Sequence, residues 1–367
     1  MVSDVLILGG GLAGGAAATL LARQGVRVRV IEREAGPHHK VCGEFLSMEA
    51  QHELDLMGID VERLGAIPVD RLRVIRGQRI VETRLPFMAC GIGRDVLDEA
   101  LLDAAKVAGA VVERGVKVIE LRRGEARTSA GDVRADTILL ATGKHNIRGA
   151  SRNPSRWRDD YVGLKMHWRL GASGRREPDG AIEMVLFDGG YAGLQRVTPD
   201  TLNLCVLIQA RRLEEIGGDW DSLLTALMSE PHLARRLGDA QPLFPRPLAV
   251  AGLPYGYVYG HDHSDSADAF RLGDQAALTA PLTGDGMAAA LRSARLAALC
   301  VTEGVSPHVY HDRLRPMISR QIRLAMHLQR ATEAPRSLTA GLALMRIWPG
   351  LLGRMAAATR LPAWNPL

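Results

Sequence analysis

The chain has 367 residues and a formal net charge of +5; 47% of its residues are apolar, 24% are charged and 4% are aromatic. This length is sufficient for two packed units, and the composition is ordinary for a globular protein. Aromatic side chains that could stack on bases are scarce, and the arginines are scattered along the chain, so we expect no nucleic-acid partner.

Other features of the sequence bear on cellular location and on metal binding. The cysteines lie far apart, without a CxxC pair or another metal-binding spacing, so we expect reduced thiols and no metal site (Cys42, Cys90, Cys205 and Cys300). The N-terminus has no basic region followed by a cleavage site, and no uncharged apolar stretch reaches the roughly 18 residues of a membrane-spanning helix. We therefore expect a cytoplasmic protein without a signal peptide or a transmembrane segment.

The first elements predicted along the chain are a strand, a helix and a second strand. Residues 4–8 (DVLIL) form a short apolar run that is typical of a buried parallel strand. The alanine-rich residues 12–24 favour a helix, which Gly25 ends, and residues 26–31 predict the second strand. This order is typical of a nucleotide-binding α/β unit.

The turn between the first strand and the helix has the spacing GxGxxG. Gly9 permits a tight turn, Gly11 admits a pyrophosphate to the backbone, and Gly14 lets the helix lie close to the strand. Glu32 ends the second strand, where a carboxylate accepts hydrogen bonds from an adenosine ribose. The unit predicts dinucleotide binding, with a glycine-rich turn of another α/β protein as the alternative. The expected cofactor contacts are Gly9, Gly11, Leu12, Ala13, Gly14, Glu32 and Arg33.

The middle of the chain predicts an antiparallel sheet. Residues 71–85 alternate like a strand pair that turns near Gly77. Asp188-Gly189-Gly190 is typical of a hairpin turn, and residues 211–240 predict helices. Four further strands are predicted at 161–170, 181–187, 191–197 and 201–208.

A second glycine-rich turn follows at residues 269–290 (AFRLGDQAALTAPLTGDGMAAA). A predicted strand ends at Gly273-Asp274, and a loop with Pro281, Gly284 and Gly286 opens another alanine-rich helix. The N-terminus of such a helix stabilises negative charge, which a reduced flavin carries near N1 and O2. A simple helix N-cap is the structural alternative for Asp274.

The two fingerprints, in this order, resemble the superfamily of geranylgeranyl reductases and p-hydroxybenzoate hydroxylase-like flavoproteins over most of residues 1–300. The resemblance implies non-covalently bound FAD and transient NAD(P)H, because members of the superfamily have no second fingerprint for a nicotinamide. Where the family often carries an Asp-Gly pair, this chain has Thr142-Gly143. The resemblance implies further cofactor contacts from Arg94, Thr142, Gly143, Gly273, Asp274, Pro281, Gly284, Gly286 and Met287.

Two segments are more similar to the reductase branch. Residues 41–47 (VCGEFLS) resemble the Cys-Gly-rich segment that geranylgeranyl reductases place near the isoalloxazine, and residues 280–288 (APLTGDGMA) resemble their P-x-TGEGI loop. The hydroxylases usually carry a histidine where this chain has Ala276 and Ala277. In the stretch GGYAGLQ, Gly193 occupies the place of the reductases' tryptophan, so the family's substrate does not transfer.

We therefore predict an FAD-dependent oxidoreductase that uses NAD(P)H for two-electron chemistry on an apolar small molecule of a biosynthetic pathway. The expected reaction is reduction of a carbon–carbon double bond or its reverse. The alternative is a flavin monooxygenase that hydroxylates an aromatic or polyketide-like substrate. A further alternative without redox activity is a nucleotide-binding regulator or an RNA-modifying protein that uses the same fold.

Catalytic candidates come from the segment near the isoalloxazine. Cys42 could donate a proton or simply pack beside the ring, and Glu44 could act as an acid or base or as a helix-starting structural residue. His38 and His39 precede them in a loop, where they either border the entrance of the site or are solvated. Four side chains on the predicted strands contact the substrate if their sheet face points toward the flavin: Lys165, His167, Tyr191 and Gln195.

The predicted fold is α/β, with a Rossmann-like FAD-binding domain, an inserted antiparallel-sheet substrate domain and a helical C-terminus. The last region is basic, and residues 317–332 carry apolar residues at helical spacing. Its helices either pack on the flavin domain or touch a membrane surface or a lipophilic carrier. The expected boundaries are 1–66, 91–155 and 262–300 for the FAD-binding domain, 67–90 and 156–261 for the substrate domain, and 301–367 for the C-terminal region.

Overall fold

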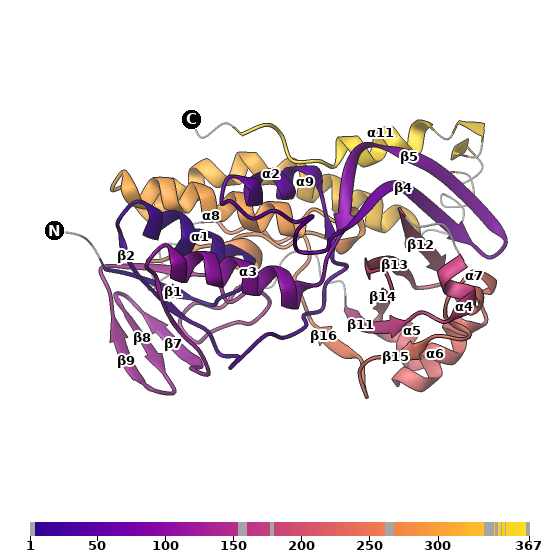
Figure 1. Cartoon of the computed structure of the whole chain (residues 1–367), viewed down its shortest axis with the longest axis horizontal. Coiled ribbons are helices and arrows are strands. Elements are labelled where there is room, and N and C mark those ends of the chain that lie inside the picture. Colours follow the sequence, from indigo (N-terminus) through magenta and orange to yellow (C-terminus); the bar gives the residue numbers. More distant parts are fainter. Residues whose placement is uncertain are drawn as a thin grey trace.

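A computed structural model of the chain describes residues 4–152, 160–176, 180–260, 268–333, 341, 344–345, 347–348 and 350–364. The expected domain boundaries at 155/156 and 261/262 lie outside the described residues. Figure 1 shows two halves, one built on a parallel sheet with helices beside it and the other on a larger sheet with short helices on its far side.

The parallel sheet has the strand order β17-β10-β1-β2-β6. Its central strand, β1 (Asp4–Leu8), is fully apolar from Val5 onward and almost completely buried, which confirms the strand predicted there. Every neighbouring pair in this sheet runs parallel. The other strands are β2 (Arg27–Ile31), β6 (Val111–Glu113), β10 (Thr137–Leu140) and β17 (Phe270–Arg271).

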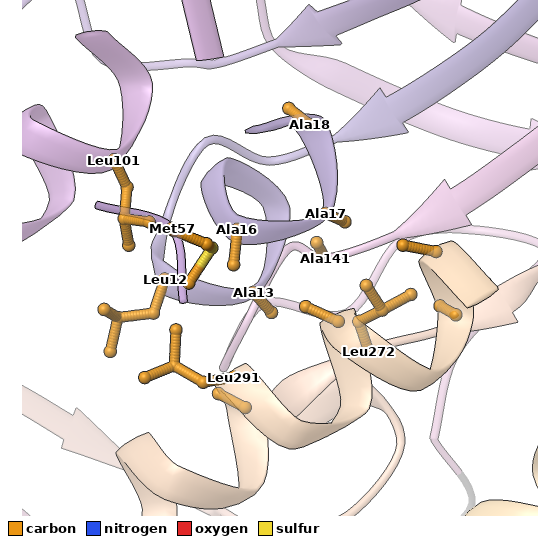
Figure 2. Packing of buried hydrophobic residues seen from close by; sticks show 14 of the residues in the cluster. Leu12, Ala13, Ala16, Ala17, Ala18, Met57, Leu101, Ala141, Leu272 and Leu291 are labelled. Carbon is orange, nitrogen blue, oxygen red and sulfur yellow. The ribbon is translucent and has the colours of Figure 1, made fainter. Parts of the chain in front are cut away.

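Small side chains let helices crowd together beside this sheet. Helix α1 (Leu12–Arg23) lies between α3 (Arg94–Val107) and α8 (Gly286–Thr302), as Figure 2 shows from Leu101 and Leu291 on either side of it. A Cβ at Gly15 would lie 2.9 Å from the Cβ of Leu101, so α1 and α3 approach too closely for a side chain there. The neighbouring helices are α2 (Met48–Asp55) and α9 (Pro307–Glu333).

A three-stranded antiparallel sheet precedes β10 and was not anticipated from the sequence. It consists of β7 (Val118–Arg122), β8 (Glu125–Thr128) and β9 (Gly131–Arg134). Figure 1 shows it at the edge of the molecule, next to the parallel sheet. Its buried side chains, including Leu121 and Ala126, pack with those of β1 and β10.

The larger sheet has the order β15-β11-β14-β13-β12-β4-β5-β3, and β16 also pairs with β11. The four strands predicted between 161 and 208 are confirmed to within about two residues, and the predicted hairpin at Gly77 forms with longer arms. The pair β12–β4 is parallel and the other pairs are antiparallel. The strands are β3 (Phe45–Leu46), β4 (Ile67–Arg76), β5 (Arg79–Gly91), β11 (Tyr161–Arg169), β12 (Ala181–Phe187), β13 (Gly190–Thr198), β14 (Thr201–Gln209), β15 (Gln241–Pro242) and β16 (Leu248–Ala251).

Side chains alternate in direction along β11, which shows what each of the two faces of this sheet contacts. Leu164 and Met166 pack with apolar residues of α6 and α7 on one face. Lys165 and His167 therefore point to the opposite face, toward the parallel-sheet half. The covering helices are α4 (Ala172–Arg176), α5 (Ala210–Glu215), α6 (Trp220–Met228) and α7 (Pro231–Leu237).

The C-terminal helices return to both halves. Helix α9 contacts β17, and α11 (Gly350–Ala358) lies along β5, as Figure 1 shows. Among the helices that are described, none is both long and apolar enough to cross a bilayer.

Candidate functional site

The first glycine-rich turn has the geometry of an anion site. Gly9 has φ +106°, and a Cβ at Gly14 would collide with the carbonyl oxygen of Gly9, so the fold requires glycine at both positions. Gly11 is the N-cap of α1 and offers no side-chain acceptor to the first amides of the helix. These amides therefore remain available to an anionic ligand at the helix N-terminus.

Glu32 supports this turn from the end of β2. Its Oε2 accepts a hydrogen bond of 2.6 Å from the amide of Gly10, and its Oε1 accepts one of 2.9 Å from the amide of Glu34. The side chain is buried and borders the cavity described below. Each carboxylate oxygen has a second lone pair, so Glu32 can hold the turn and still accept from a ribose hydroxyl.

Two cations lie beside the N-terminus of α1. Arg94 donates to Asp98 through Nε (2.9 Å) and NH2 (3.0 Å), and Lys40 Nζ lies 2.7 Å from the same carboxylate. A Cβ at Gly11 would lie 2.9 Å from Lys40 Nζ and 3.8 Å from Arg94 NH2. Burial lowers the pKa of the Arg94 guanidinium, but the Asp98 charge outweighs it, so the pKa is raised and Arg94 is permanently charged. Lys40 was not among the predicted cofactor residues, because a single loop lysine carries no sequence signal.

The second glycine-rich turn opens onto the same space. Gly273 has φ +54° and donates from its amide to Ser293 Oγ (2.9 Å), which ties the turn to α8. Asp274 lies in the short 3-10 turn Gly273–Gln275 and is not the N-cap of α8, which is Asp285. The N-cap alternative for Asp274 is therefore wrong.

One cavity of about 880 Å³ joins the two turns. Leu12 and Thr283, which belong to different turns, both line it. The predicted cofactor residues that line it are Gly9, Gly11, Leu12, Ala13, Glu32, Arg33, Arg94, Thr142, Gly143, Gly273, Asp274, Pro281, Gly284, Gly286 and Met287. Gly14 does not, because it acts through close packing against Gly9.

The far part of the cavity is apolar and lies between the larger sheet and the C-terminal helices. Strands β4, β5, β12 and β13 supply one wall, and α9, α11 and residues between them supply the other. Of the described charged residues that line the cavity, only Arg360 belongs to this part. The described apolar residues of this part include Leu72, Val74, Leu85, Phe87, Met184, Leu186, Leu328, Met345, Leu352 and Met355.

The comparisons with known proteins agree with this geometry. The family model described as an FAD binding domain matches residues 2–139. Menaquinone reductase of Mycobacterium tuberculosis (strain ATCC 25618 / H37Rv) is 27% identical over 377 residues, covering 94% of this chain and 88% of that protein. These matches confirm the resemblance to FAD-dependent aromatic hydroxylases and oxidoreductases, and the chain is an FAD-dependent oxidoreductase or monooxygenase.

Solved structures of flavoproteins share the fold. A flavoprotein/dehydrogenase from Cytophaga hutchinsonii superposes with a TM-score of 0.79 at 19% identity, covering 99% of this chain and 93% of that one. The flavin-dependent brominase Bmp2 gives a TM-score of 0.78 at 19% identity, covering 99% and 96%. The mixed α/β architecture with its Rossmann-like sheet is thus that of FAD-binding enzymes.

In this flavoprotein, the segment near Cys42 faces the second turn. A Cβ at Gly284 would lie 2.6 Å from Phe45 Cδ1, so residues 42–45 and the start of α8 border the same part of the cavity. Cys42 lines the cavity, its Sγ accepts from the Glu44 amide (3.3 Å), and its carbonyl oxygen accepts from Asn203 Nδ2 (3.0 Å). Its chemical role stays a prediction.

The structure joins Glu44 to two residues predicted as substrate contacts. Glu44 precedes β3 and does not start a helix, so the helix-starting interpretation is wrong. Its carboxylate lies 2.5 Å from Lys165 Nζ and 2.7 Å from His167 Nε2. Lys165 and His167 lie behind Glu44 and are not among the residues that line the cavity. We therefore correct their expected role: they contact Glu44 rather than the substrate space.

Tyr191 and Gln195 do line the cavity, from β13. Burial raises the pKa of Tyr191 far above its ordinary value, so its hydroxyl is neutral. Gln195 is 2% exposed, and among the described residues neither its Nε2 nor its Oε1 has a hydrogen-bond partner. A buried amide without partners costs about 1–3 kcal/mol, which a polar group of a ligand could recover.

Proposed function

We propose that this flavoprotein takes two electrons from NAD(P)H and reduces an apolar small molecule, most simply at a carbon–carbon double bond. The observation that carries the proposal is the single cavity that runs from the FAD cradle into a space with apolar walls. Bound FAD supplies the two-electron chemistry, so the chain itself needs only to bind, orient and protonate.

The relatives support reduction as the reaction. Menaquinone reductases match 82–94% of this chain, whereas the flavin-dependent halogenase armH1 of Armillaria mellea matches 32% of it. We therefore propose a lipophilic substrate of the quinone or polyprenyl type. Residues 280–288, with their similarity to the reductases' loop, point the same way.

Gln195 and Tyr191 are proposed to orient the polar end of this substrate. They stand on the same strand face, with Gly193 between them. Because Gly193 has no side chain, the sheet leaves room for a ring or a chain above it. The unpartnered amide of Gln195 can donate to a carbonyl oxygen or accept from a hydroxyl.

A route from a lipid surface is part of the proposal. Gly341 and Met345 line the apolar part of the cavity, and the neighbouring Leu344, Ile347 and Trp348 are 51%, 83% and 53% exposed. Arg354 lies over the Trp348 ring at 5.2 Å. Exposed apolar and aromatic side chains next to arginine are typical of segments that rest on anionic membranes.

The decisive experiment uses flavin-loaded protein, reduced by NADH or NADPH without oxygen and then mixed with menaquinone. We expect the flavin absorbance to return and mass spectrometry to find a product that has gained two hydrogen atoms. A flavin monooxygenase would instead need oxygen and insert a labelled oxygen atom. Purified protein without flavin absorbance, or reduced flavin that only oxygen reoxidises, would contradict the proposal.

A further inference from the structure

Glu44 has an unusual backbone and an unusual environment. Among the described residues, only Glu44 and Asp268 are non-glycine residues with positive φ, and Glu44 has φ +59°. A left-handed conformation strains the backbone of any residue other than glycine, and the Glu44 side chain is fully buried. A strained backbone conformation therefore places a carboxylate that is shielded from water at the edge of the cavity.

Three groups hold this carboxylate. Oε1 accepts from Lys165 Nζ (2.5 Å) and from the backbone amide of Arg94 (2.9 Å), and Oε2 lies 2.7 Å from His167 Nε2. Burial would raise the pKa of Glu44, but the hydrogen bond with His167 and the charge of Lys165 outweigh burial and lower it. Glu44 is thus ionised at rest and ready to accept a proton from either neighbour.

The histidine side of this cluster leads toward solvent. The His167 ring meets the His39 ring edge-on with centroids 4.9 Å apart, and Phe244 packs on both rings. His39 Nδ1 lies 3.2 Å from Asp95 Oδ1, and these two side chains are about 30% exposed (31% and 29%). Suitable nitrogen and oxygen atoms of His39, His167 and Glu44 all lie within 4.8 Å of one another, a separation that one water molecule spans.

We propose that His39, His167 and Glu44 form a proton relay from solvent to the reaction centre, with Lys165 fixing the carboxylate. The inference rests on the proposed reductase function. Adding a hydride and a proton across a double bond consumes one proton per turnover, while both electrons come from NAD(P)H through the cofactor. His167 gives its Nε2 proton to Glu44 Oε2, Glu44 passes a proton into the cavity, and His39 restores the proton of His167 from solvent.

Two histidines and a carboxylate are also a donor set for a divalent cation. Lys165 argues against that use, because its ammonium already lies against Oε1 and would repel a metal ion. Stoichiometric zinc, iron or manganese in the purified protein, lost together with activity on chelation, would overturn the relay.

The main test measures anaerobic reoxidation of reduced flavin by menaquinone in Glu44→Gln, His167→Gln and His39→Gln. We expect the first two to lose roughly 10²-fold in rate with FAD still bound. His39→Gln is expected to lose less and to regain rate with added imidazole buffer, because its position is reached from solvent. The pH profile of each variant should move, whereas a purely structural role would leave the profile in place.

Phe244→Leu is the matched control, because Phe244 packs on both histidine rings but carries no proton. It should keep the wild-type rate and pH profile. Unchanged rates in all three relay variants, or an equal loss in Phe244→Leu, would overturn the relay.

A second readout needs no turnover and separates the relay from the proposed function. In flavin-loaded protein without substrate, NMR of labelled histidine rings should show that His39→Gln slows the exchange of the His167 ring proton with water, and Phe244→Leu should not slow it. If wild-type protein fails to reduce menaquinone but this effect is present, the proposed function fails alone. Unchanged proton exchange at His167 in His39→Gln would overturn the relay.

Discussion

Arg360, which follows α11, places its guanidinium NH2 2.9 Å from Asp285 Oδ1 at the N-terminus of α8. The same nitrogen donates to the carbonyl oxygen of Thr283 at 2.5 Å, and the guanidinium also lies over the rings of Phe45 and Phe87. The C-terminal region is thus attached to the turn that borders the flavin-facing part of the cavity. Two segments 75 positions apart therefore act on one loop.

Asp285 should make folding stability depend on pH in an uncommon direction. Burial raises its pKa from 3.8 to about 7, although Arg360 opposes the shift. Between these pH values the folded chain keeps a proton on Asp285 that the unfolded chain has lost. The contribution of this proton to the free energy of unfolding is therefore fully present below about pH 4 and lost above about pH 7. Within this window, each rise of one pH unit lowers the free energy of unfolding of the wild type by about 1.4 kcal/mol, and Asp285→Asn removes this dependence.

The measurement is thermal unfolding of wild type and Asp285→Asn across pH 4.5–8. The unfolding temperature of Asp285→Asn, relative to that of the wild type, should increase as the pH rises. Asp188, whose side chain is 76% exposed, supplies the control, and Asp188→Asn should leave the pH dependence unchanged. Parallel curves for wild type and Asp285→Asn would show that Asp285 titrates normally.

The glycine turn predicts a sharp contrast between two alanine substitutions. In Gly14→Ala the new Cβ collides with the Gly9 carbonyl oxygen, so α1 must move away from β1 and the anion site widens. We expect protein that is unstable or purifies colourless. Gly36→Ala is the control, because a Cβ there meets nothing within 4 Å and its φ is not positive. Flavin retained at wild-type affinity in Gly14→Ala would contradict the assigned turn.

The local parts of the site were predictable, because their chemistry needs a particular pattern within a short stretch. Both glycine turns and Glu32 follow from backbone geometry and anion binding over about thirty residues. Strand alternation likewise predicted that Lys165 and His167 share a face. It could not say what that face meets, because their partner Glu44 is 121 and 123 residues away.

Other parts carried no usable signal. The strands β7 (VIELR), β8 (EART) and β9 (GDVR) have only four or five residues each, too few for the sustained apolar alternation that marks a strand. His39 was expected at the entrance of the site or in solvent, since nothing in the loop sequence indicates that its ring packs on His167. Arg360 is one of many arginines, and only tertiary structure brings it to Asp285.

The exposed residues near the cavity predict binding to lipid. Replacing both Ile347 and Trp348 by serine removes apolar area that would otherwise enter a membrane. We expect at least a tenfold weaker association with vesicles containing anionic lipid, measured by sedimentation, while FAD binding is unchanged. Val107→Ser is the control, since Val107 is 90% exposed on α3 and belongs to no such group. Equal vesicle binding by the double variant would remove this surface from the proposed function.

A buried charge cluster on the outer face of β12 should control stability without touching the cofactor. Glu183 is 1% exposed and lies 2.9 Å from His232 Nε2, 3.1 Å from Arg73 NH1 and 3.2 Å from Arg236 Nε. Burial would raise its pKa, but His232 and Arg236 outweigh burial and lower it. The contribution of ionised Glu183 to the free energy of unfolding is therefore present above about pH 4.5 and is lost as the pH falls below that value.

Glu183→Gln removes the carboxylate that Arg236 and His232 share and leaves Arg73 with Glu82 as its carboxylate partner among the described residues, so we expect a loss of about 3–5 kcal/mol in the free energy of unfolding. Glu82 also pairs with Arg73 but is 38% exposed, and Glu82→Gln should cost less than about 1 kcal/mol. Urea unfolding at pH 7 measures both, and flavin absorbance should be unchanged because the cavity-lining residues of β12 are its alternate ones, Ile182, Met184 and Leu186. Equal stability of the two variants would mean that the cluster is solvated in the folded protein, since only burial makes the loss of one partner so costly.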